Sequence, residues 1–247
     1  MGADHLVIDL ENICFTYPDG RTVLSGLSFK LEEGARAGLI GPNGSGKTTL
    51  LHMLMGLIPQ TEGTIRLFGR EMQAETDFRE SRKKIGLVFQ NADDQLFSPT
   101  VLEDVAFGPL NLGASPAEAK EIAIKTLTDL NLIGFEDRIS YRLSGGEKKL
   151  VALATVLAMD PAVLVMDEPT TGLDEETNDR IVNILNALDK TLLIVSHEYD
   201  FLARTTRNFF SMRQGQVFDA GDSSKLHTHV HAHIEGGLPH KHRTLIK

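Results

Sequence analysis

Apolar residues in the first third of the chain occur in short runs bounded by glycine, proline and polar residues, a pattern typical of β-strands. We predict strands over residues 6–10, 13–17, 27–31, 36–40, 64–68 and 85–89, with a turn at 18–20. The strand at 36–40 leads directly into a glycine-rich loop. A helix from residue 47 to about residue 57 is expected to follow this loop.

From about residue 91 to residue 159 the pattern is mostly helical. Ser115 and Glu118 have the spacing of a capping box, in which a serine and a glutamate three residues later satisfy the free amides at a helix start. Ser144 and Glu147 repeat this spacing. The two boxes predict helices that run to about residues 130 and 158.

The last third returns to an α/β pattern. The unbroken apolar run at 163–166 is typical of a strand buried on both faces of a parallel sheet. We predict a helix at 174–188, a strand at 191–195 and a hairpin at 209–218 around Gly215. The sequence thus indicates an α/β core interrupted by a helical insertion.

Composition narrows the class of protein. The 247 residues are 41% hydrophobic and 24% charged, which is ordinary for a globular protein, and the formal charge of −9 argues against a general binder of polyanions such as nucleic acid. A single cysteine, Cys14, cannot close a disulfide within the chain. No apolar run is long enough to cross a bilayer and no secretory signal begins the chain, so we expect a cytoplasmic protein. If it works at a membrane, another protein must hold it there.

The loop after residue 40 has the sequence of a P-loop, Gly41-Pro42-Asn43-Gly44-Ser45-Gly46-Lys47-Thr48. Its glycines let successive amides point at phosphate, Lys47 adds a charge at the β- and γ-phosphates, and the Thr48 hydroxyl can bind Mg²⁺. The helix that follows offers its first amides to the same anion. Kinases, GTPases and many ATPases share this loop. A GTPase is disfavoured because the chain has no Asn-Lys-x-Asp motif.

A second anion-binding helix start is predicted at Leu143-Ser144-Gly145-Gly146-Glu147. Ser144 and the two glycines present a hydroxyl and free amides at the beginning of a helix. One chain that carries both a P-loop and this separate site suggests that two copies close head to tail over nucleotide.

With these two motifs, the chain resembles the nucleotide-binding subunits of ABC transporters from about residue 6 to residue 221. Residues 143–147 match the signature motif of that family, and Val163-Leu164-Val165-Met166-Asp167-Glu168 matches its Walker B motif. The resemblance implies an α/β fold with a P-loop NTPase (RecA-like) core, an antiparallel β subdomain and an inserted helical subdomain. The ATPase domain would span residues 1–220, with the insertion at about 91–160 and a histidine-rich tail at 221–247.

The same resemblance implies roles for individual residues in the binding and hydrolysis of ATP with Mg²⁺. Glu168 would act as general base, with His197 and Gln90 as further catalytic residues. Thr48, Gln90 and Asp167 would bind Mg²⁺. The residues expected to contact the nucleotide are Tyr17 under the adenine, Gly41, Asn43, Gly44, Ser45, Gly46, Lys47, Thr48, Thr49, and, from the signature motif and the D-loop, Ser144, Gly145, Gly146, Glu147 and Asp174.

A narrower resemblance is carried by residues 88–97 and 101–109, which look like the energy-coupling-factor group of importers, including cobalt and nickel uptake ATPases. It implies a transmembrane component and a substrate-binding membrane subunit as partners, and a homodimer, or a heterodimer with a related ATPase, on the cytoplasmic face of the cell membrane. Candidate partner contacts are Asp93, Asp94, Gln95, Leu96 and Phe97. Vitamin uptake is less favoured, because many such ATPases carry a folded C-terminal extension that the sequence does not predict here.

The tail after Gly221 holds six of the nine histidines of the chain. His227, His229, His231 and His233 alternate, so an extended segment would place them on one face. Imidazole suits Ni²⁺, Co²⁺, Cu²⁺ and Zn²⁺, with a lean towards nickel over cobalt. The tail therefore predicts capture of a transported metal, and its alternative is a polar segment that binds metals adventitiously.

Two further functions stay open from the residues. One is a soluble ABC-type ATPase of translation or DNA repair, although such proteins commonly carry two nucleotide domains or a long coiled-coil insertion. The other is a metal-storage or metallochaperone module in which nucleotide binding is incidental.

Overall fold

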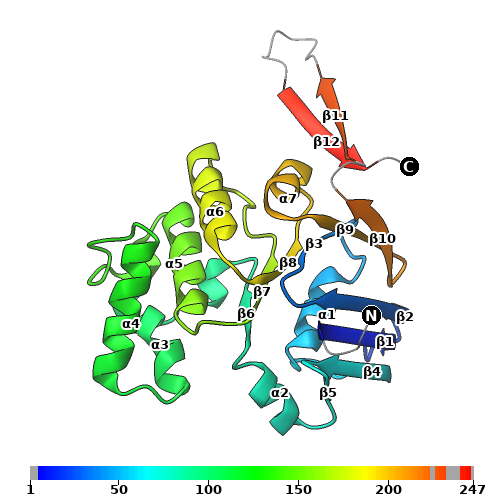
Figure 1. Cartoon of the computed structure of the whole chain (residues 1–247), viewed down its shortest axis with the longest axis horizontal. Helices are drawn as coiled ribbons and strands as arrows, with labels where there is room; N and C mark the ends of the chain where they lie inside the picture. Colours follow the sequence, from blue (N-terminus) through cyan, green and yellow to red (C-terminus); the bar gives the residue numbers. More distant parts are fainter. Residues whose placement is uncertain (1–4, 223–225, 232–239, 246–247) are drawn as a thin grey trace. The chain divides into compact units, whose positions relative to one another are not determined.

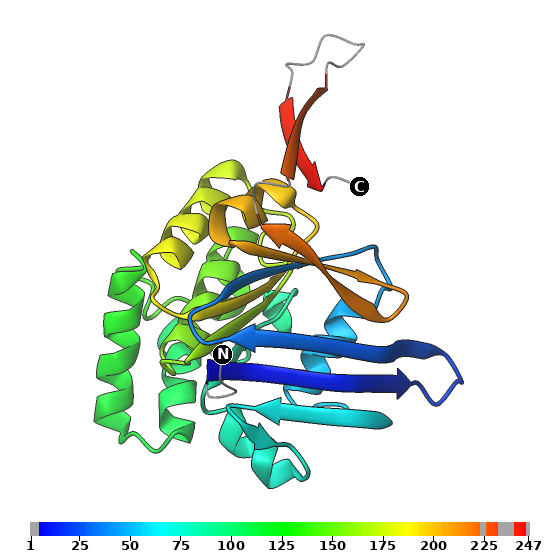
Figure 2. The same ribbon diagram turned by 45° about the vertical axis from the view of Figure 1, so that its right-hand side comes forward.

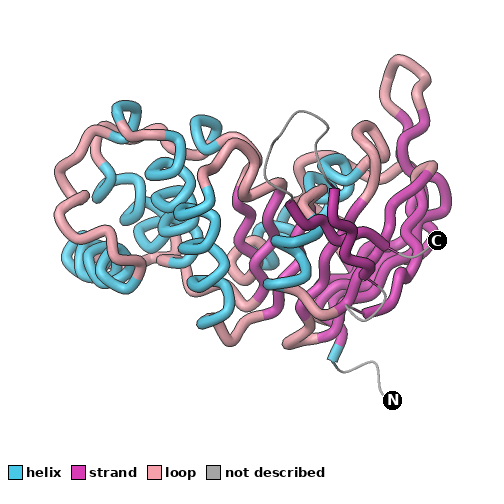
Figure 3. Tube along the Cα trace, turned by 90° about the horizontal axis from the view of Figure 1, so that it is seen from above, coloured by secondary structure: helices cyan, strands magenta, loops and turns pink. Residues whose placement is uncertain are grey.

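The computed structural model describes residues 5–222, 226–231 and 240–245, the last two ranges by their backbone only. The chain divides into two compact units (Figure 1). Unit one comprises Met1–Glu71 and Leu192–Lys247, and unit two comprises Met72–Thr191. Unit one is rich in strands, and most of the helical residues belong to unit two (Figure 3).

Unit one contains an antiparallel sheet with the strand order β2-β1-β4-β5 (Figure 2). The strands are β1 (Leu6–Thr16), β2 (Thr22–Glu32), β4 (Glu62–Leu67) and β5 (Arg70–Glu71). The sequence predicted two separate strands where β1 is continuous. Asn12, at φ 52°, lies where the β1–β2 register shifts between Leu10 and Ile13, so an irregularity within one strand produces the break in the pattern.

The second sheet of unit one places β10 (Gln216–Asp222), β9 (Asn208–Arg213), β3 (Arg36–Ile40) and β8 (Thr191–Val195) in that order, with β3 parallel to both β8 and β9. The predicted hairpin around Gly215 is confirmed: Gln214 and Gly215 both have positive φ, as a two-residue hairpin turn requires. The predicted helix after the P-loop is α1 (Lys47–Leu54), and it ends earlier than expected. The sequence did not predict α7 (Tyr199–Thr205), a short helix that buries Phe201 and Leu202.

Unit two contains the parallel strands β6 (Ile85–Val88) and β7 (Val163–Asp167). Every residue of both strands is buried, which confirms the interpretation of the apolar run. The helices of this unit are α2 (Glu75–Ser81), α3 (Val101–Asn111), α4 (Pro116–Asp129), α5 (Gly145–Leu157) and α6 (Glu175–Ala187). Capping boxes at Ser115 and Ser144 start α4 and α5, as predicted. The helix α2 was not predicted.

Within the tail, β11 (Leu226–His231) pairs antiparallel with β12 (His240–Leu245). The register sets His229 opposite His242 and His231 opposite His240. Composition predicted a biased segment and no strand pair, because alternating polar residues give no apolar signal. His233 lies outside the described residues, and so do all side chains from residue 223 onward. A helix with the length and apolar character to span a bilayer is absent from the described residues.

Candidate functional site

The P-loop lies in unit one between β3 and α1, in the strand–loop–helix context that its sequence predicts. Gly44 and Gly46 adopt positive φ angles of 77° and 105°, which fold the backbone around the loop. The Lys47 side chain is buried, and its Nζ donates hydrogen bonds to the carbonyl oxygens of Gly41 at 2.8 Å and Pro42 at 3.1 Å. The loop thus fixes the position of its own ammonium group.

The inside of this loop has the properties of a phosphate cradle. A Cβ atom at Gly41 would lie 2.5 Å from the carbonyl oxygen of Met212 and 2.9 Å from Ser45 Oγ, so only glycine fits there. Ser45 Oγ is buried and has no hydrogen-bond partner among the described residues. Because an unsatisfied buried hydroxyl is costly, an anion that accepts a hydrogen bond from it would stabilise the loop. These residues therefore fit the phosphates of a nucleotide.

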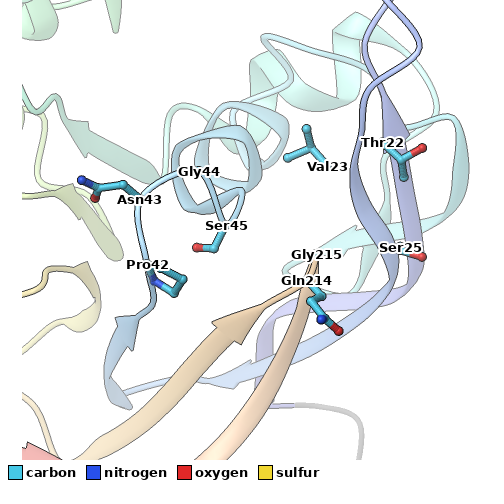
Figure 4. Close-up of a pocket in the computed structure, with 9 residues that line it drawn as sticks. All are labelled: Thr22, Val23, Ser25, Pro42, Asn43, Gly44, Ser45, Gln214 and Gly215. Carbon is cyan, nitrogen blue, oxygen red and sulfur yellow. The ribbon is translucent and has the colours of Figure 1, made fainter.

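Tyr17 and a neighbouring cavity extend the site within unit one. The Tyr17 hydroxyl is 3.2 Å from Thr49 Oγ1, and the Arg21 guanidinium lies 5.0 Å from the Tyr17 ring centroid. A cavity of about 440 Å³ opens beside the P-loop (Figure 4). It is lined by the P-loop, by the start of β2 and by the β9–β10 turn, through Thr22, Val23, Ser25, Pro42, Asn43, Gly44, Ser45, Gln214 and Gly215. Sequence reasoning missed the β2 and turn residues, because they are remote from the motif along the chain.

In unit two, the signature motif forms the start of α5. Ser144 Oγ accepts from the Glu147 amide at 3.3 Å, and the Ser144 amide donates to Glu147 Oε2 at 2.8 Å. That backbone hydrogen bond is the main cause that lowers the pKa of Glu147, and Arg138, 2.8 Å away, adds to it. Gly145 is exposed, with open space around the position of a Cβ. The helix start is therefore well capped and accessible, as an anion site requires.

The signature motif also lies close to the predicted D-loop residue. A Cβ at Gly146 would be 3.0 Å from Thr177 Oγ1 on α6. The Thr177 amide donates to Asp174 Oδ1 at 2.8 Å, which makes Asp174 the N-cap of that helix. This bond is also the main cause that lowers the pKa of Asp174. The structure thus brings Gly146 and Asp174 together at adjoining helix starts.

Asp167 and Glu168, the predicted Walker B carboxylates, lie at the end of β7, and both are buried. Glu168 has φ 45°, in the left-handed region that a non-glycine residue adopts only at a cost. Its carbonyl oxygen accepts a hydrogen bond from Lys149 Nζ at 3.4 Å, and Lys149 also donates to the carbonyl oxygen of Gln90. A lysine of α5 thus joins the predicted catalytic residues Gln90 and Glu168.

Sequence reasoning missed Lys149. Its burial lowers the pKa of its ammonium group, while Asp167 and Glu168 act in the opposite direction. A usable signal existed, because Lys149 is three, four and seven residues before the buried Ala152, Leu153 and Val156. This spacing puts a charged residue on the buried face of α5.

In the segment after Gln90, the side chain of Gln95 is hydrogen-bonded within unit two and that of Phe97 is exposed. The Gln95 side chain accepts from the Phe89 amide and donates to the Ala152 carbonyl and to Thr155 Oγ1, both at 2.7 Å. The Gln95 side chain therefore makes these hydrogen bonds inside unit two. Phe97 is 66% exposed, and its ring meets the half-exposed Phe107 ring edge to face at 4.8 Å.

His197 and Gln90 are the remaining residues that were predicted to be catalytic. His197 is exposed in unit one, two residues after β8, and Gln90 is exposed in unit two, two residues after β6. Over the residues whose side chains are described, no group of three or more His, Cys, Asp and Glu is arranged to hold a metal ion. The side chains of the predicted tail ligands, His227, His229, His231 and His233, are not among them.

Comparisons with known proteins show the family of the chain. The family model for ABC transporters matches residues 24–171. A protein of Nitratidesulfovibrio vulgaris whose name gives only the ABC transporter ATP-binding family is 50% identical over 238 residues, which cover 96% of this chain and 86% of that protein. The energy-coupling factor transporter ATP-binding protein EcfA of Methanothermobacter thermautotrophicus is 43% identical over 219 residues, covering 87% of this chain and 70% of EcfA.

The fold of this chain also matches that of a solved structure. The solved structure of cbiO1 from Clostridium perfringens, described as part of the ABC transporter complex cbiONQ, superposes with a TM-score of 0.78 at 31% identity. The match covers 89% of this chain and 90% of cbiO1. It confirms the predicted fold class, a P-loop α/β core with an antiparallel β part and inserted helices. The chain therefore belongs to the ABC transporter family of ATP-binding proteins and is an ATPase of that family.

Proposed function

We propose that this ATPase is the nucleotide-binding subunit of an energy-coupling-factor importer, which drives uptake of a nickel or cobalt ion through a membrane partner. The observation that carries the proposal is the segment from Gln90 to Phe97, whose sequence is typical of that group and which ends in an exposed aromatic pair, Phe97 and Phe107. The similarity to a protein named EcfA supports the same assignment. The subunit would lie on the cytoplasmic face of the membrane as a peripheral protein.

Residues of each unit have a proposed role in the binding and hydrolysis of ATP. In unit one, the P-loop amides, Lys47 and Ser45 hold the phosphates of ATP, and Tyr17 offers its ring to the adenine. In unit two, Glu168 takes a proton from the water that attacks the γ-phosphorus, and the bond from that phosphorus to the ADP oxygen breaks. His197 hydrogen bonds to the γ-phosphate.

Mg²⁺ fits the oxygen donors that the chain supplies. A hydroxyl from Thr48, an amide oxygen from Gln90 and a carboxylate from Asp167 are the hard ligands that this ion prefers. When bound, the ion neutralises charge that develops on the phosphate oxygens. Along the chain, Thr48 lies in the first turn of α1, Gln90 is two residues after β6 and Asp167 is the last residue of β7.

We propose that the active form is a homodimer in which the signature helix of one copy closes over the nucleotide of the other. The start of α5 supports this arrangement, because Gly145 is exposed with open space around it and a helix N-terminus attracts anions. A heterodimer with a related ATPase would use the same surfaces. Asp174, beside Gly146, would lie at the same dimer surface.

A pair of serine variants tests the role of the signature helix. Ser144→Ala and Ser115→Ala each remove the N-cap of a capping box, so each is expected to cost about 1 kcal/mol in the free energy of unfolding. Only Ser144→Ala is expected also to lower ATP turnover, by about tenfold or more, because α5 is proposed to contact nucleotide and α4 is not. Equal turnover in the two variants, measured by phosphate release, would exclude a nucleotide contact at Ser144.

The docking face for the membrane partner is the aromatic pair of Phe97 and Phe107, which follows Gln90 along the chain. Hydrogen bonds to Asp104 hold the backbone at Phe97 in place. The buried Asp104 carboxylate accepts hydrogen bonds from the Phe97 amide at 3.1 Å, from the Ser98 amide at 2.8 Å and from Ser140 Oγ at 2.6 Å. Aromatic side chains held in place lose little entropy on binding, which makes them effective anchors for an apolar partner helix.

The metal cargo is supported by the tail. The alternation of His227, His229 and His231 falls within β11, and β12 brings His240 and His242 opposite that strand. Imidazole binds nickel and cobalt ions well. The strand pair thereby concentrates histidines in a short backbone segment, which favours a metal over a vitamin as cargo.

Uptake of labelled Ni²⁺ and Co²⁺ in cells that lack the chain tests cargo and docking together. Wild type is expected to restore uptake, and Phe97→Ala to restore about a tenth of it, since losing an anchor residue costs about 1.4 kcal/mol or more. Ile133→Ala is the control, because Ile133 is an apolar residue of unit two with a similar exposure, 70%. Restored uptake of a vitamin but of neither metal would refute the cargo, and full uptake with Phe97→Ala would refute the docking face.

A further inference from the structure

A buried lysine requires an explanation, because lysine is almost never buried unless its charge is satisfied. Lys149 is 7% exposed on α5, and its Nζ donates to two backbone carbonyl oxygens, those of Gln90 and Glu168. These carbonyls belong to segments that follow the neighbouring parallel strands β6 and β7. Lys149 therefore ties together the ends of two strands from a third element.

The backbone of Glu168 needs such a tie. At φ 45° this residue holds a left-handed conformation that costs about 1 kcal/mol or more outside glycine. Its carbonyl oxygen accepts from the Thr171 amide and from Lys149 Nζ, each at 3.4 Å. Because rotation of this peptide would turn the carbonyl away from both donors, the two hydrogen bonds favour the conformation that sets the direction of the Glu168 side chain.

We propose that Lys149 is a positioning residue for hydrolysis, which fixes the Glu168 carboxylate by holding the carbonyl oxygens of Gln90 and Glu168 at one ammonium group. This inference rests on the proposed role of Glu168 as general base. Since Gln90 begins the segment that ends at Phe97, Lys149 also makes the direction of Glu168 depend on the backbone that leads to the docking face. A shift of Gln90 on partner binding would reach Glu168 through this one side chain.

The preceding residue offers a matched control. Lys148 is on the same turn of α5 and is also partly buried, but its Nζ pairs with the exposed Asp93 carboxylate at 2.5 Å. It therefore links α5 to the same segment through a side chain and makes no contact with Glu168 among the described hydrogen bonds. A pair of this kind near the surface contributes little to stability.

The test compares Lys149→Met with Lys148→Met in the full chain, by ATP titration and by steady-state phosphate release. We expect Lys149→Met to bind ATP as wild type does and to lose about 100-fold in kcat, the cost of a misdirected catalytic group. Lys148→Met should keep the kcat of wild type. If Lys149→Met does not fold, as judged by circular dichroism, Lys149→Gln takes its place. Its shorter side chain keeps an amide donor, and it is expected to show the same unchanged ATP binding and lower kcat.

A double variant separates positioning from packing. Because Lys149 acts through Glu168, adding Lys149→Met to Glu168→Gln should leave the residual turnover of Glu168→Gln unchanged. A further drop in the double variant, a wild-type kcat in Lys149→Met, or a loss of ATP affinity without a loss of kcat would each overturn the inference. Absence of turnover in wild type would instead refute the proposed hydrolytic roles, so the two failures are distinguishable.

Discussion

Glu168→Gln should bind ATP with wild-type affinity and release phosphate about 1,000-fold more slowly. Glutamine has the shape of glutamate and leaves the β7 end intact, but its amide cannot accept a proton from the attacking water. Glu168 is buried directly after β7, and the variant keeps the size of that buried side chain. The rate of phosphate release at saturating ATP and Mg²⁺ measures this effect directly.

Glu121→Gln is the control for this variant, because it makes the same chemical change at an exposed position of α4. It should hydrolyse ATP at the wild-type rate. Turnover of Glu168→Gln within a few-fold of wild type would show that another group accepts the proton, and the assignment of the general base would then be wrong.

Lys47→Ala should lose about 100-fold in ATP affinity, equivalent to about 2.7 kcal/mol, which is within the range for a hydrogen bond to a charged group. The variant removes the positive charge that meets the phosphates. It also leaves the carbonyl oxygens of Gly41 and Pro42 without the Lys47 donor. Isothermal titration with ATP measures the loss.

Lys30→Ala controls for the loss of a positive charge in unit one. Lys30 lies on β2 and pairs with Asp9 at 3.3 Å, on the exposed side of the antiparallel sheet. Its replacement should leave ATP affinity unchanged. If Lys47→Ala and Lys30→Ala bound ATP equally well, the loop would not be the phosphate site.

The sequence predicted those parts of the fold whose signals are local. Capping boxes at Ser115 and Ser144 marked helix starts, because their hydrogen bonds join residues only three positions apart. Gly215 marked a hairpin for the same reason, since a two-residue turn depends on its own φ angles. Where packing between remote segments decides the structure, the pattern misled: pairing with β2 and β4 carries β1 through Asn12 as one strand.

The candidate site divides in the same way. Lys47, Ser144 and Glu168 could be proposed from the sequence, because each role demands a residue type at a fixed spacing within a motif. The spacing of apolar residues could indicate the burial of Lys149 but not its role, because that role depends on two carbonyl oxygens that β6 and β7 bring together. Every residue has a backbone carbonyl that can accept a hydrogen bond, so the residue types of these segments do not reveal which carbonyls Lys149 contacts.

In the proposed active form, two copies of this chain close over ATP, with the signature helix of each on the nucleotide of the other. Light scattering on Glu168→Gln measures this most directly, because that variant is expected to bind ATP and to hydrolyse it only slowly. With ATP and Mg²⁺ the particle should have twice the mass of one chain, and with ADP the mass of one chain. A single-chain mass at ATP concentrations that saturate binding would contradict the claim.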